Sequence, residues 1–507
     1  MPNQHRQTLQ QRVQDAEAAS QFPDLPLVMP LVLDLDRCLV ASDLLFESLI
    51  VAMRGNLLVV FSCLYWLMTG GRAGLKRKLA EIAYLDTGLL PANEGLVALA
   101  KTEMRAGRDI VLATAADELL ANRFKRRFDF IGRVIASDGA RNLKGSRKAD
   151  VLLGEYPRGF IYAGDSPADL PVWKHSVGVV TVGASAATRR KARAFGKPTI
   201  DVDGPRLTIT GLMTSIRLEQ WAKNALVFAP VALAGKFADI AAWIDAGLAF
   251  IAIGFLASAT YLINDLSDLA DDRRHWSKRN RPLASGRMPI PIALMLIPLL
   301  LVAACAFGFT LSPAGFAVLA LYGATTLLYC FKLKRVPIAD VMTLASLFTL
   351  RLLLGVAAIG AALSPWLFVF SMALFFSISL AKRHVEVVRM RAHGMVETAG
   401  RGYDTRDEPF LLTLGVGSGL SSVVLLSLYL SADAFRAAHY GAPQFLWFAP
   451  AIILLWLSRI WLLAQRGELD DDPVAFALGD KPSLWLGAML CLAFLAAAFG
   501  NHIAWPV

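Results

Sequence analysis

The sequence predicts two domains: an α/β domain with a doubly wound parallel sheet, followed by an all-α domain of nine transmembrane helices. Residues 31–203 alternate short apolar runs with charged helical segments, which is typical of an α/β domain. From about residue 217 onward the apolar runs reach roughly 17 to 25 residues, the length that crosses a bilayer core as a helix. Hydrophobic residues make up 55% of the chain, too many for a wholly soluble protein. The predicted limits are a polar segment at 1–27, the α/β domain at 28–205 with a cap insertion around 44–90, and the membrane domain at 206–507.

Strands are expected at 31–33, 110–112, 160–162 and 179–182. The nine spans are expected at 218–235, 243–265, 290–308, 313–331, 338–358, 365–383, 409–431, 445–464 and 483–504. Lys and Arg gather after the second, fourth, sixth and eighth of these spans. Because cytoplasmic loops carry the excess of basic residues, this asymmetry places the N-terminus and the α/β domain in the cytoplasm and the C-terminus outside. The net charge of +10 thus reflects topology, and no nucleic-acid partner is expected.

An apolar stretch at 57–68 interrupts the α/β domain and is too short to span a bilayer. One interpretation is a buried helix of the cap. The other is a cap helix that lies on the membrane surface, which the flanking Arg72, Lys76, Arg77 and Lys78 favour.

Acidic residues recur at the end of the second predicted span. Asn264, Asp268 and Asp272 stand every four residues and so share one face of a helix, with Asp265 beside them. Carboxylates in a membrane persist where they bind a cation or face a polar cavity. Oxygen ligands suit Mg²⁺, which bridges carboxylates to a substrate diphosphate. The alternative is a solvated helix end.

This stretch resembles the first aspartate motif, NDxxDxxxD, of the UbiA prenyltransferase superfamily. The residues that follow, Lys278 to Gly286 with Arg281 between them, resemble the KxxRPxxxG loop of the same family. The resemblance implies a nine-helix membrane enzyme that binds Mg²⁺ at Asn264, Asp265, Asp268 and Asp272.

A second aspartate repeat, found in prenyltransferases that act on aromatic acceptors, is incomplete here. Asp340 is kept, but Leu344 and Phe348 stand where further acids are expected. The surrounding residues instead resemble the polyprenyl-phosphate phosphoribosyltransferase branch of the superfamily. The residues that carry this resemblance are Lys223 and Asn224 (RPxQWxKN), Tyr329, Lys332, Lys334 and Asp340 (YxxKxKxxPxxD), Lys382, Arg383 and Glu386 (GKRxxE), and Arg401 and Tyr403 (RGY).

The resemblance implies transfer of 5-phosphoribose from phosphoribosyl pyrophosphate to a polyprenyl phosphate, with release of pyrophosphate, at a bacterial inner membrane. Mg²⁺ is expected to neutralise the leaving pyrophosphate, with Asp268 and Asp272 as catalytic carboxylates. The residues that carry the resemblance to the phosphoribosyltransferase branch, together with Lys278 and Arg281, are expected to bind phosphoribosyl pyrophosphate and the polyprenyl phosphate. The alternatives are an aromatic prenyltransferase that uses a polyprenyl diphosphate and a non-catalytic lipid-binding scaffold. The sequence leaves a homo-oligomer open.

The first domain resembles phosphatases of the haloacid dehalogenase (HAD) type. Asp34-Leu-Asp36 resembles their first motif, Thr114 follows the next strand, and Asp165 to Asp169 resemble their GDxxxD metal motif. The resemblance implies that Asp34 is a nucleophile and Asp36 an acid/base group. A Mg²⁺ site is expected at Asp34, Asp36, Asp165 and Asp169.

A lysine is expected to bind the phosphoryl oxygens together with Thr114. Lys148, which opens a helix, is favoured over Lys144, and both remain candidates. Such a phosphatase would remove the 5-phosphate of the product lipid to give polyprenyl-phosphoryl-ribose, a precursor of arabinose donors. A degenerate, non-catalytic domain is the alternative.

Overall fold

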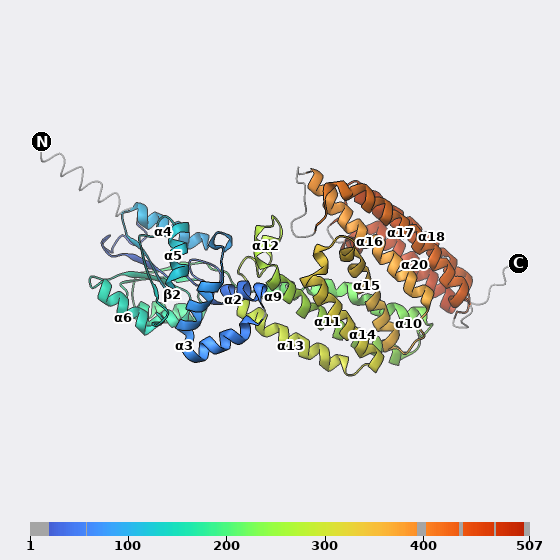
Figure 1. Cartoon of the computed structure of the whole chain (residues 1–507), viewed down its shortest axis with the longest axis horizontal. Coiled ribbons are helices and arrows are strands. Elements are labelled where there is room, and N and C mark those ends of the chain that lie inside the picture. The colour runs from blue at the N-terminus through green and yellow to red at the C-terminus, as the bar shows by residue number, and fades with distance from the viewer. Residues whose placement is uncertain (1–19, 57, 393–401, 436–439, 471–472, 501–507) are drawn as a thin grey trace. The chain divides into compact units, whose positions relative to one another are not determined.

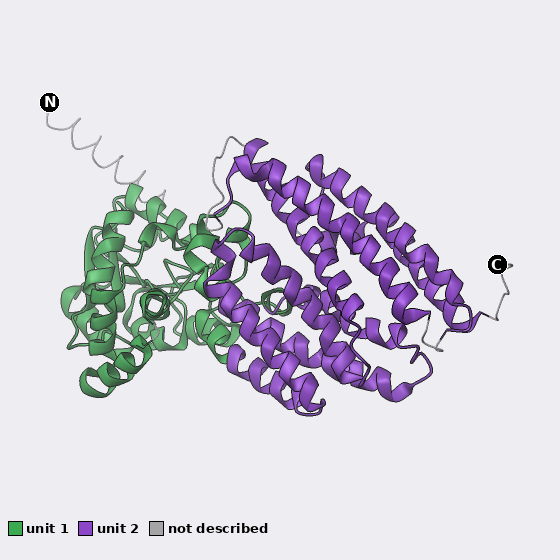
Figure 2. Ribbon diagram, turned by 45° about the vertical axis from the view of Figure 1, so that its right-hand side comes forward, with its two compact units in different colours: residues 1–215, 265–295 green, residues 216–264, 296–507 purple. Residues whose placement is uncertain are grey.

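The computed structural model describes residues 20–500, apart from 57, 393–401, 436–439 and 471–472 (Figure 1). The chain divides into two compact units (Figure 2). The first unit holds residues up to 215 together with 265–295, and the second holds 216–264 together with 296–507. The first unit thus combines the predicted α/β domain with a segment from the predicted membrane domain.

Six parallel strands form the sheet of the first unit, in the order β3-β2-β1-β4-β5-β6. Apolar side chains of β1, β2 and β4 are buried on both faces of this sheet, as a parallel sheet covered by helices on both sides requires. This confirms the doubly wound prediction. Ligands of such sheets bind beyond the carboxyl ends of the strands, where the strand order reverses. The strands are β1 (Leu31–Leu33), β2 (Ile110–Asp117), β3 (Arg133–Ser137), β4 (Ile161–Gly164), β5 (Gly178–Val182) and β6 (Thr199–Val202).

Two helices, α2 (Leu44–Gly55) and α3 (Val59–Ile82), form an insertion between β1 and β2, in the region predicted as a cap. Short 3-10 helices lie at Thr87–Leu89, Pro167–Asp169 and Lys278–Asn280. The other helices of the first unit are α4 (Glu94–Arg105), α5 (Glu118–Arg127), α6 (Ser146–Glu155), α7 (Leu170–His175), α8 (Ala186–Arg193), α9 (Ile209–Ser215) and α12 (Leu269–Arg274).

The apolar stretch at 57–68 falls at the start of α3. None of residues 58–72 is buried, whereas Ala73, Leu79 and Ala80 are buried beyond a kink at Gly71. The interpretation of this stretch as a buried cap helix is therefore wrong for its described residues. Gly71 permits the kink because its φ of 60° lies in the left-handed region that favours glycine.

Eight of the described helices are long and apolar enough to cross a membrane. All eight lie mainly or wholly in the second unit, although α11 ends and α13 begins in the first. A further short helix, α19, spans Pro473–Gly479. The eight are α11 (Ile240–Ser267), α13 (Ile290–Gly308), α14 (Pro313–Phe331), α15 (Ala339–Ala358), α16 (Pro365–Ala392), α17 (Glu408–Tyr429), α18 (Phe448–Gln465) and α20 (Lys481–Phe499).

The predicted first span at 218–235 is wrong as a single long helix, so eight such helices replace the nine predicted. The chain forms a 3-10 helix at Leu218–Phe228 and then the five-residue helix α10 at Ala229–Leu233. Pro230 stands in the first turn of α10. Because proline has no backbone N–H, it favours the start of a new helix over the continuation of the preceding one.

A buried ion pair anchors the segment that leads into β1. Arg108 and Glu103 are both buried, and the Arg108 Nε lies 2.8 Å from a Glu103 carboxylate oxygen. Arg108 also donates hydrogen bonds to the carbonyl oxygens of Pro26 and Met29, at 2.9 and 2.7 Å. The pair therefore fixes the chain that enters the central strand.

We expect Arg108→Ala to lower the free energy of unfolding of the first unit by about 3 kcal/mol, because it leaves the Glu103 carboxylate buried without its partner. Thermal proteolysis of the full-length protein would detect this as cleavage within 20–215 at a lower temperature. Arg105→Ala is the matched control, since Arg105 is exposed at the end of α4. Equal melting of the two variants would contradict the anchoring role.

Candidate active sites

The phosphatase-like residues meet at the carboxyl end of the sheet. Asp34 directly follows β1, and Lys148 lies in the first turn of α6 with its Nζ 3.0 Å from Asp34 Oδ1. Lys148 also donates to the Tyr162 hydroxyl at 2.8 Å, and that hydroxyl donates to Asp169 at 2.9 Å. This geometry favours Lys148 over Lys144, which precedes α6. Sequence reasoning missed Tyr162, because its signal was only that of an apolar strand.

Three carboxylates form a cluster that could hold a metal ion. The ligand atoms of Asp34, Asp165 and Asp169 all lie within 4.8 Å of one another. Asp169 accepts hydrogen bonds from the backbone N–H groups of Asp165 and Ser166, at 3.1 and 3.0 Å. Gly164 allows this close turn, since a Cβ there would lie 2.6 Å from Asp169 Cγ. A hard oxygen donor set of this kind fits Mg²⁺.

Electrostatics support a cation at this cluster. Burial, together with the neighbouring carboxylates of Asp169 and Asp34, raises the pKa of Asp165 to about 8. Like charges held this close oppose each other's ionisation unless a positive charge balances them. Lys148 supplies one such charge beside Asp34. The negative charge of the three carboxylates, when all are ionised, exceeds the single positive charge of Lys148.

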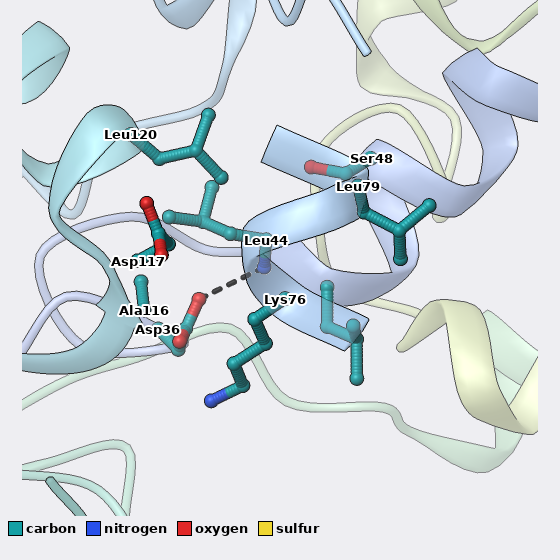
Figure 3. Close-up of a pocket in the computed structure, with 9 residues that line it drawn as sticks. Asp36, Leu44, Ser48, Lys76, Leu79, Ala116, Asp117 and Leu120 are labelled. Carbon is teal, nitrogen blue, oxygen red and sulfur yellow. Dashed lines mark hydrogen bonds between the residues drawn. The ribbon is translucent and has the colours of Figure 1, made fainter. Parts of the chain in front are cut away.

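Asp36 lies outside this cluster, although it was expected to contribute to the metal site. Its carboxylate accepts a hydrogen bond from the Leu44 backbone N–H at 2.8 Å, at the start of α2, and lines a small pocket with Lys76 and Asp117 (Figure 3). Burial raises the pKa of Asp36 to about 7, and the charge of Asp43 adds to the shift. A carboxyl group that keeps a proton near neutral pH can act as a general acid.

Thr114 and Lys76 are both held by hydrogen bonds to the backbone of β2. Thr114 is fully buried in β2, and its hydroxyl oxygen accepts a hydrogen bond from the Ala116 N–H at 2.9 Å. Lys76 comes from the second half of α3 and donates to the Ala115 carbonyl oxygen at 2.6 Å. Figure 3 shows Lys76 beside Asp36, so the cap insertion contributes a positive charge to the pocket. The sequence analysis had noted Lys76 only as a flanking basic residue.

The acidic motif of the membrane half does not follow one continuous helix. α11 ends at Ser267 and α12 begins at Leu269, with Asp268 between them. The predicted stripe of Asn264, Asp268 and Asp272 on one helical face is therefore interrupted, because the backbone leaves helical geometry at Asp268 (φ −96°, ψ 7°).

Arg281 joins two carboxylates of this motif. Its Nη1 lies 2.6 Å from Asp272 and 3.3 Å from Asp265, and both carboxylates are buried. Arg281 belongs to the predicted KxxRPxxxG loop, so the structure brings the two sequence motifs together. Lys278 of the same loop is half-buried.

An ion pair inside the first unit fixes this loop to the cap insertion. Both guanidinium Nη atoms of Arg273 in α12 donate to the Glu47 carboxylate of α2, at 3.0 and 2.5 Å, and Arg273 Nε donates to the Ala284 carbonyl oxygen at 3.0 Å. Gly286 packs so closely that a Cβ would lie 2.1 Å from the Ala41 carbonyl oxygen. Sequence reasoning missed this contact because it joins two predicted domains.

In the second unit, Asp340 at the start of α15 is part of a buried ionic network. Arg383 donates to both Asp340 carboxylate oxygens, one at 2.9 Å, and to Glu386 at 2.7 Å. The Tyr329 hydroxyl donates to Asp340 at 2.9 Å. Arg383 was expected to bind a substrate phosphate directly; these contacts favour a positioning role, in which it fixes α15 against α16.

The remaining predicted binding residues are placed as follows. Lys334 donates to Asn264 Oδ1 at 3.2 Å, and the Tyr403 hydroxyl accepts a hydrogen bond from the Ile338 N–H at 3.0 Å. Lys223 and Lys382 are half-buried and Lys332 is exposed. Arg401 lies outside the described residues.

Sequence reasoning also missed Arg351, a buried cation inside α15. Arg351 donates to Asn224 Oδ1 at 2.9 Å and to the Tyr322 hydroxyl at 2.8 Å, so it links three segments of the second unit. The sequence does indicate Arg351, because it is a single charged residue within a predicted apolar span, and charged residues in spans are rare and functional. The contact also assigns the predicted Asn224 to this polar network.

The model of the UbiA prenyltransferase family matches residues 225–479. The chain belongs to this family. A protein of Sinorhizobium fredii described as uncharacterized is 38% identical over 92% of this chain and 91% of its own length. The decaprenyl-phosphate phosphoribosyltransferase of Mycolicibacterium smegmatis is 32% identical over 55% of this chain and 89% of its own length. The UbiA region is thus related to decaprenyl-phosphate phosphoribosyltransferases.

For the N-terminal region, a HAD family hydrolase from Salmonella enterica serovar Typhi aligns in structure. The alignment has a TM-score of 0.27 and 16% identity, and covers 35% of this chain and 70% of that chain. The chain therefore joins an α/β region with a six-stranded parallel sheet to a UbiA-family membrane region.

We expect Lys148→Met to lower the phosphatase activity of the full-length protein about 100-fold, because it removes the charge beside Asp34 that phosphoryl oxygens require. Hydrolysis of p-nitrophenyl phosphate measures this. Lys144→Met is the matched control and should stay within a few fold of the parent. The reverse order of the two variants would assign the role to Lys144.

We expect Glu47→Gln to lower the stability of the 265–295 segment by about 3 kcal/mol, because it leaves the Arg273 guanidinium without its buried counter-charge. Faster proteolysis of this segment in the full-length protein measures the change. Arg54→Gln breaks a second ion pair between the same helices, Arg54 to Asp271 at 2.9 Å, but an exposed one. Arg54→Gln should lower the stability of the segment by about 1 kcal/mol or less. Equal rates of proteolysis in the two variants would contradict the larger contribution of the buried pair.

Proposed function

We propose that the UbiA region transfers 5-phosphoribose from phosphoribosyl pyrophosphate to a polyprenyl phosphate, and that the HAD-like region then removes the 5-phosphate. The observation that carries the first step is the environment of Asp340. This carboxylate is paired with Arg383 and accepts a hydrogen bond from Tyr329. Phe348 stacks on Phe375 at 4.8 Å where a prenyltransferase of aromatic acceptors would carry an acid. The relation to decaprenyl-phosphate phosphoribosyltransferases supports the same reading.

Both active sites would face the cytoplasm. Residues up to 215 and residues 265–295 pack in one unit, so the chain between them must leave this side of the membrane and return. α11 supplies one crossing, and the broken segment before it must supply the other. Its 11 residues of 3-10 helix and five of α-helix reach about 30 Å, the thickness of a bilayer core. The basic loops favour the cytoplasmic side.

In the transfer step, the bond between C1 of the ribose and the pyrophosphate oxygen breaks, and C1 bonds to an oxygen of the lipid phosphate. The electron pair leaves with pyrophosphate. The acceptor phosphate is already an anionic nucleophile, so no general base is required. Asn264, Asp265, Asp268 and Asp272 would hold Mg²⁺, which supplies charge neutralisation to the leaving group. Arg281, between Asp265 and Asp272, holds these carboxylates in place.

Basic side chains would bind the phosphate groups of both substrates. The candidates are Lys223, Lys278, Lys332, Lys334 and Lys382. Arg383 and Tyr403 would not contact the substrates; they would position α15 and the loop before it. Lysine suits this task because its ammonium is a mobile point charge that adapts to a moving phosphate.

In the phosphatase step, Asp34 attacks the phosphorus of the 5-phosphate and the bond to the sugar oxygen breaks. Asp36, protonated near neutral pH, donates its proton to that oxygen. The aspartyl-phosphate is then hydrolysed by water, whose proton passes to Asp36. Lys148 and Thr114 would bind the phosphoryl oxygens. Asp34, Asp165 and Asp169 would hold Mg²⁺, which neutralises the phosphate.

We expect purified full-length protein with Mg²⁺, labelled phosphoribosyl pyrophosphate and decaprenyl phosphate to yield a lipid-linked ribose and free pyrophosphate. Asp272→Asn should lower this transfer about 100-fold, since it removes one carboxylate from the cation site. Asp271→Asn is the matched control, because Asp271 is the exposed neighbour in the same helix. Absence of any lipid-linked ribose from the parent protein would falsify the transfer.

Asp34→Asn should keep the transfer but make the product accumulate with its 5-phosphate. Mass spectrometry of the extracted lipid distinguishes the phosphorylated from the dephosphorylated form. If the parent and the variant give the same product, the phosphatase domain does not act on this lipid.

A further inference from the structure

The first half of α3 presents apolar side chains that no part of the described chain covers. Phe61, Leu64, Tyr65 and Met68 are 69%, 55%, 64% and 88% exposed. Their spacing of three, four and seven residues places them on one face of the helix. Leu58 and Leu67 beside them are also exposed.

The other faces of this half of α3 are not packed into a protein core either. None of residues 58–72 is buried, and the half-buried ones include Val59, Cys63 and Trp66. A helix that is apolar around most of its circumference is normally enclosed by a protein core or by lipid. A contiguous exposed apolar surface of this size marks an interaction site.

Beyond Gly71, the same helix changes character. Its second half buries Leu79 and Ala80 against the α/β core and carries Lys76 to the pocket beside Asp36. Exposed Arg72 and Lys78 lie just past the kink. Basic residues next to an apolar helical face are attracted to anionic lipid headgroups.

The connections of the first unit hold it at a bilayer. The chain passes directly from α9, which ends at Ser215, into the membrane region, and it enters and leaves the 265–295 segment through α11 and α13. The links through α11 and α13, which are long and apolar enough to cross a membrane, therefore keep this unit at the membrane surface. A lipid surface is available to α3 at all times, whereas a protein partner would have to be recruited.

We propose that residues 58–70 of α3 insert into the headgroup and acyl boundary of the bilayer, and that the phosphatase site consequently acts on phosphate esters carried by membrane lipids. One helix would contact lipid with its first half and line the pocket with its second. This deepens the phosphatase activity proposed above and rests on it for the substrate class. The contact with lipid itself does not depend on that activity.

The lipid contact is tested by fluorescence quenching in the full-length protein in nanodiscs with anionic lipid. Met68→Cys, in a background with Cys63, Cys305 and Cys491 replaced by Ser, carries the fluorophore; Cys38 and Cys330 are buried and stay. Nitroxide-labelled lipids should quench this fluorophore strongly. Met104→Cys is the matched control, since Met104 is an exposed methionine of the same unit on α4, and it should remain unquenched.

Equal quenching at the two positions, or none at position 68, would overturn the lipid contact. A fluorophore at position 68 that is shielded but not quenched by lipid would instead indicate cover by the membrane helices. Cross-linking between two unlabelled chains of the Met68→Cys variant, together with no quenching of the labelled one, would overturn the lipid contact and indicate a second copy. Failure of the transferase or phosphatase assay leaves these readouts intact, so the two proposals can fail separately.

The substrate class is tested with Phe61→Gln, Leu64→Gln and Met68→Gln combined, which changes only exposed side chains. Turnover of soluble p-nitrophenyl phosphate should be unchanged. Dephosphorylation of the phosphorylated lipid made by Asp34→Asn, presented in the same nanodiscs, should fall about tenfold, since the apolar anchor is lost. Equal loss on both substrates would mean that this face serves the fold of the cap, and no loss on either would refute interfacial action.

Discussion

Every buried carboxylate in this chain lies in a medium of low dielectric constant, and a charge there is costly unless an opposite charge neutralises it. The structure meets this constraint with specific pairs: Asp34 with Lys148, Glu47 with Arg273, Asp272 with Arg281, and Asp340 with Arg383. Three of these pairs join elements that are distant in sequence, whereas Asp272 and Arg281 are nine residues apart. The pairs therefore fix the positions of the candidate active-site elements as well as balance their charges.

The loop after α11 shows how this constraint joins the two regions. In sequence it belongs to the UbiA family region, which begins at residue 225. In space it packs with the N-terminal α/β region as one compact unit. Arg273 turns toward the cap insertion, while its neighbour Asp272 turns toward Arg281. A displacement of the cap insertion would therefore move Arg273, and Arg273 is the direct neighbour of Asp272, a carboxylate of the predicted aspartate motif.

Local pattern predicted much of the fold. The strands β1, β2, β4 and β5 are apolar runs that lie inside the sheet, and the eight long helices are apolar runs of membrane length. β3 and β6 were missed because they are the edge strands, where only one neighbour and partial burial leave a weaker apolar signal. The segment at 218–233 has the composition of a span, but Pro230 and its polar residues divide it.

Motif spacing predicted the candidate site residues, but it did not predict their partners. The order of Asp34, Thr114, Lys148 and Asp165 along the chain was enough to place them at one sheet edge. The pairing of Arg383 with Asp340 across 43 residues, and the break of the helix at Asp268, depend on packing that one sequence does not encode locally. Those features moved Arg383 from phosphate binding to positioning.

The Glu47 to Arg273 pair also has a consequence for biosynthesis. The partners are 226 residues apart, and chains emerge from the ribosome N-terminal end first. The N-terminal α/β region is therefore complete in sequence before Arg273 has been made, and α11 must enter the bilayer before Arg273 can reach Glu47. The cap insertion thus obtains the counter-charge for Glu47 only after α11 has been inserted into the membrane.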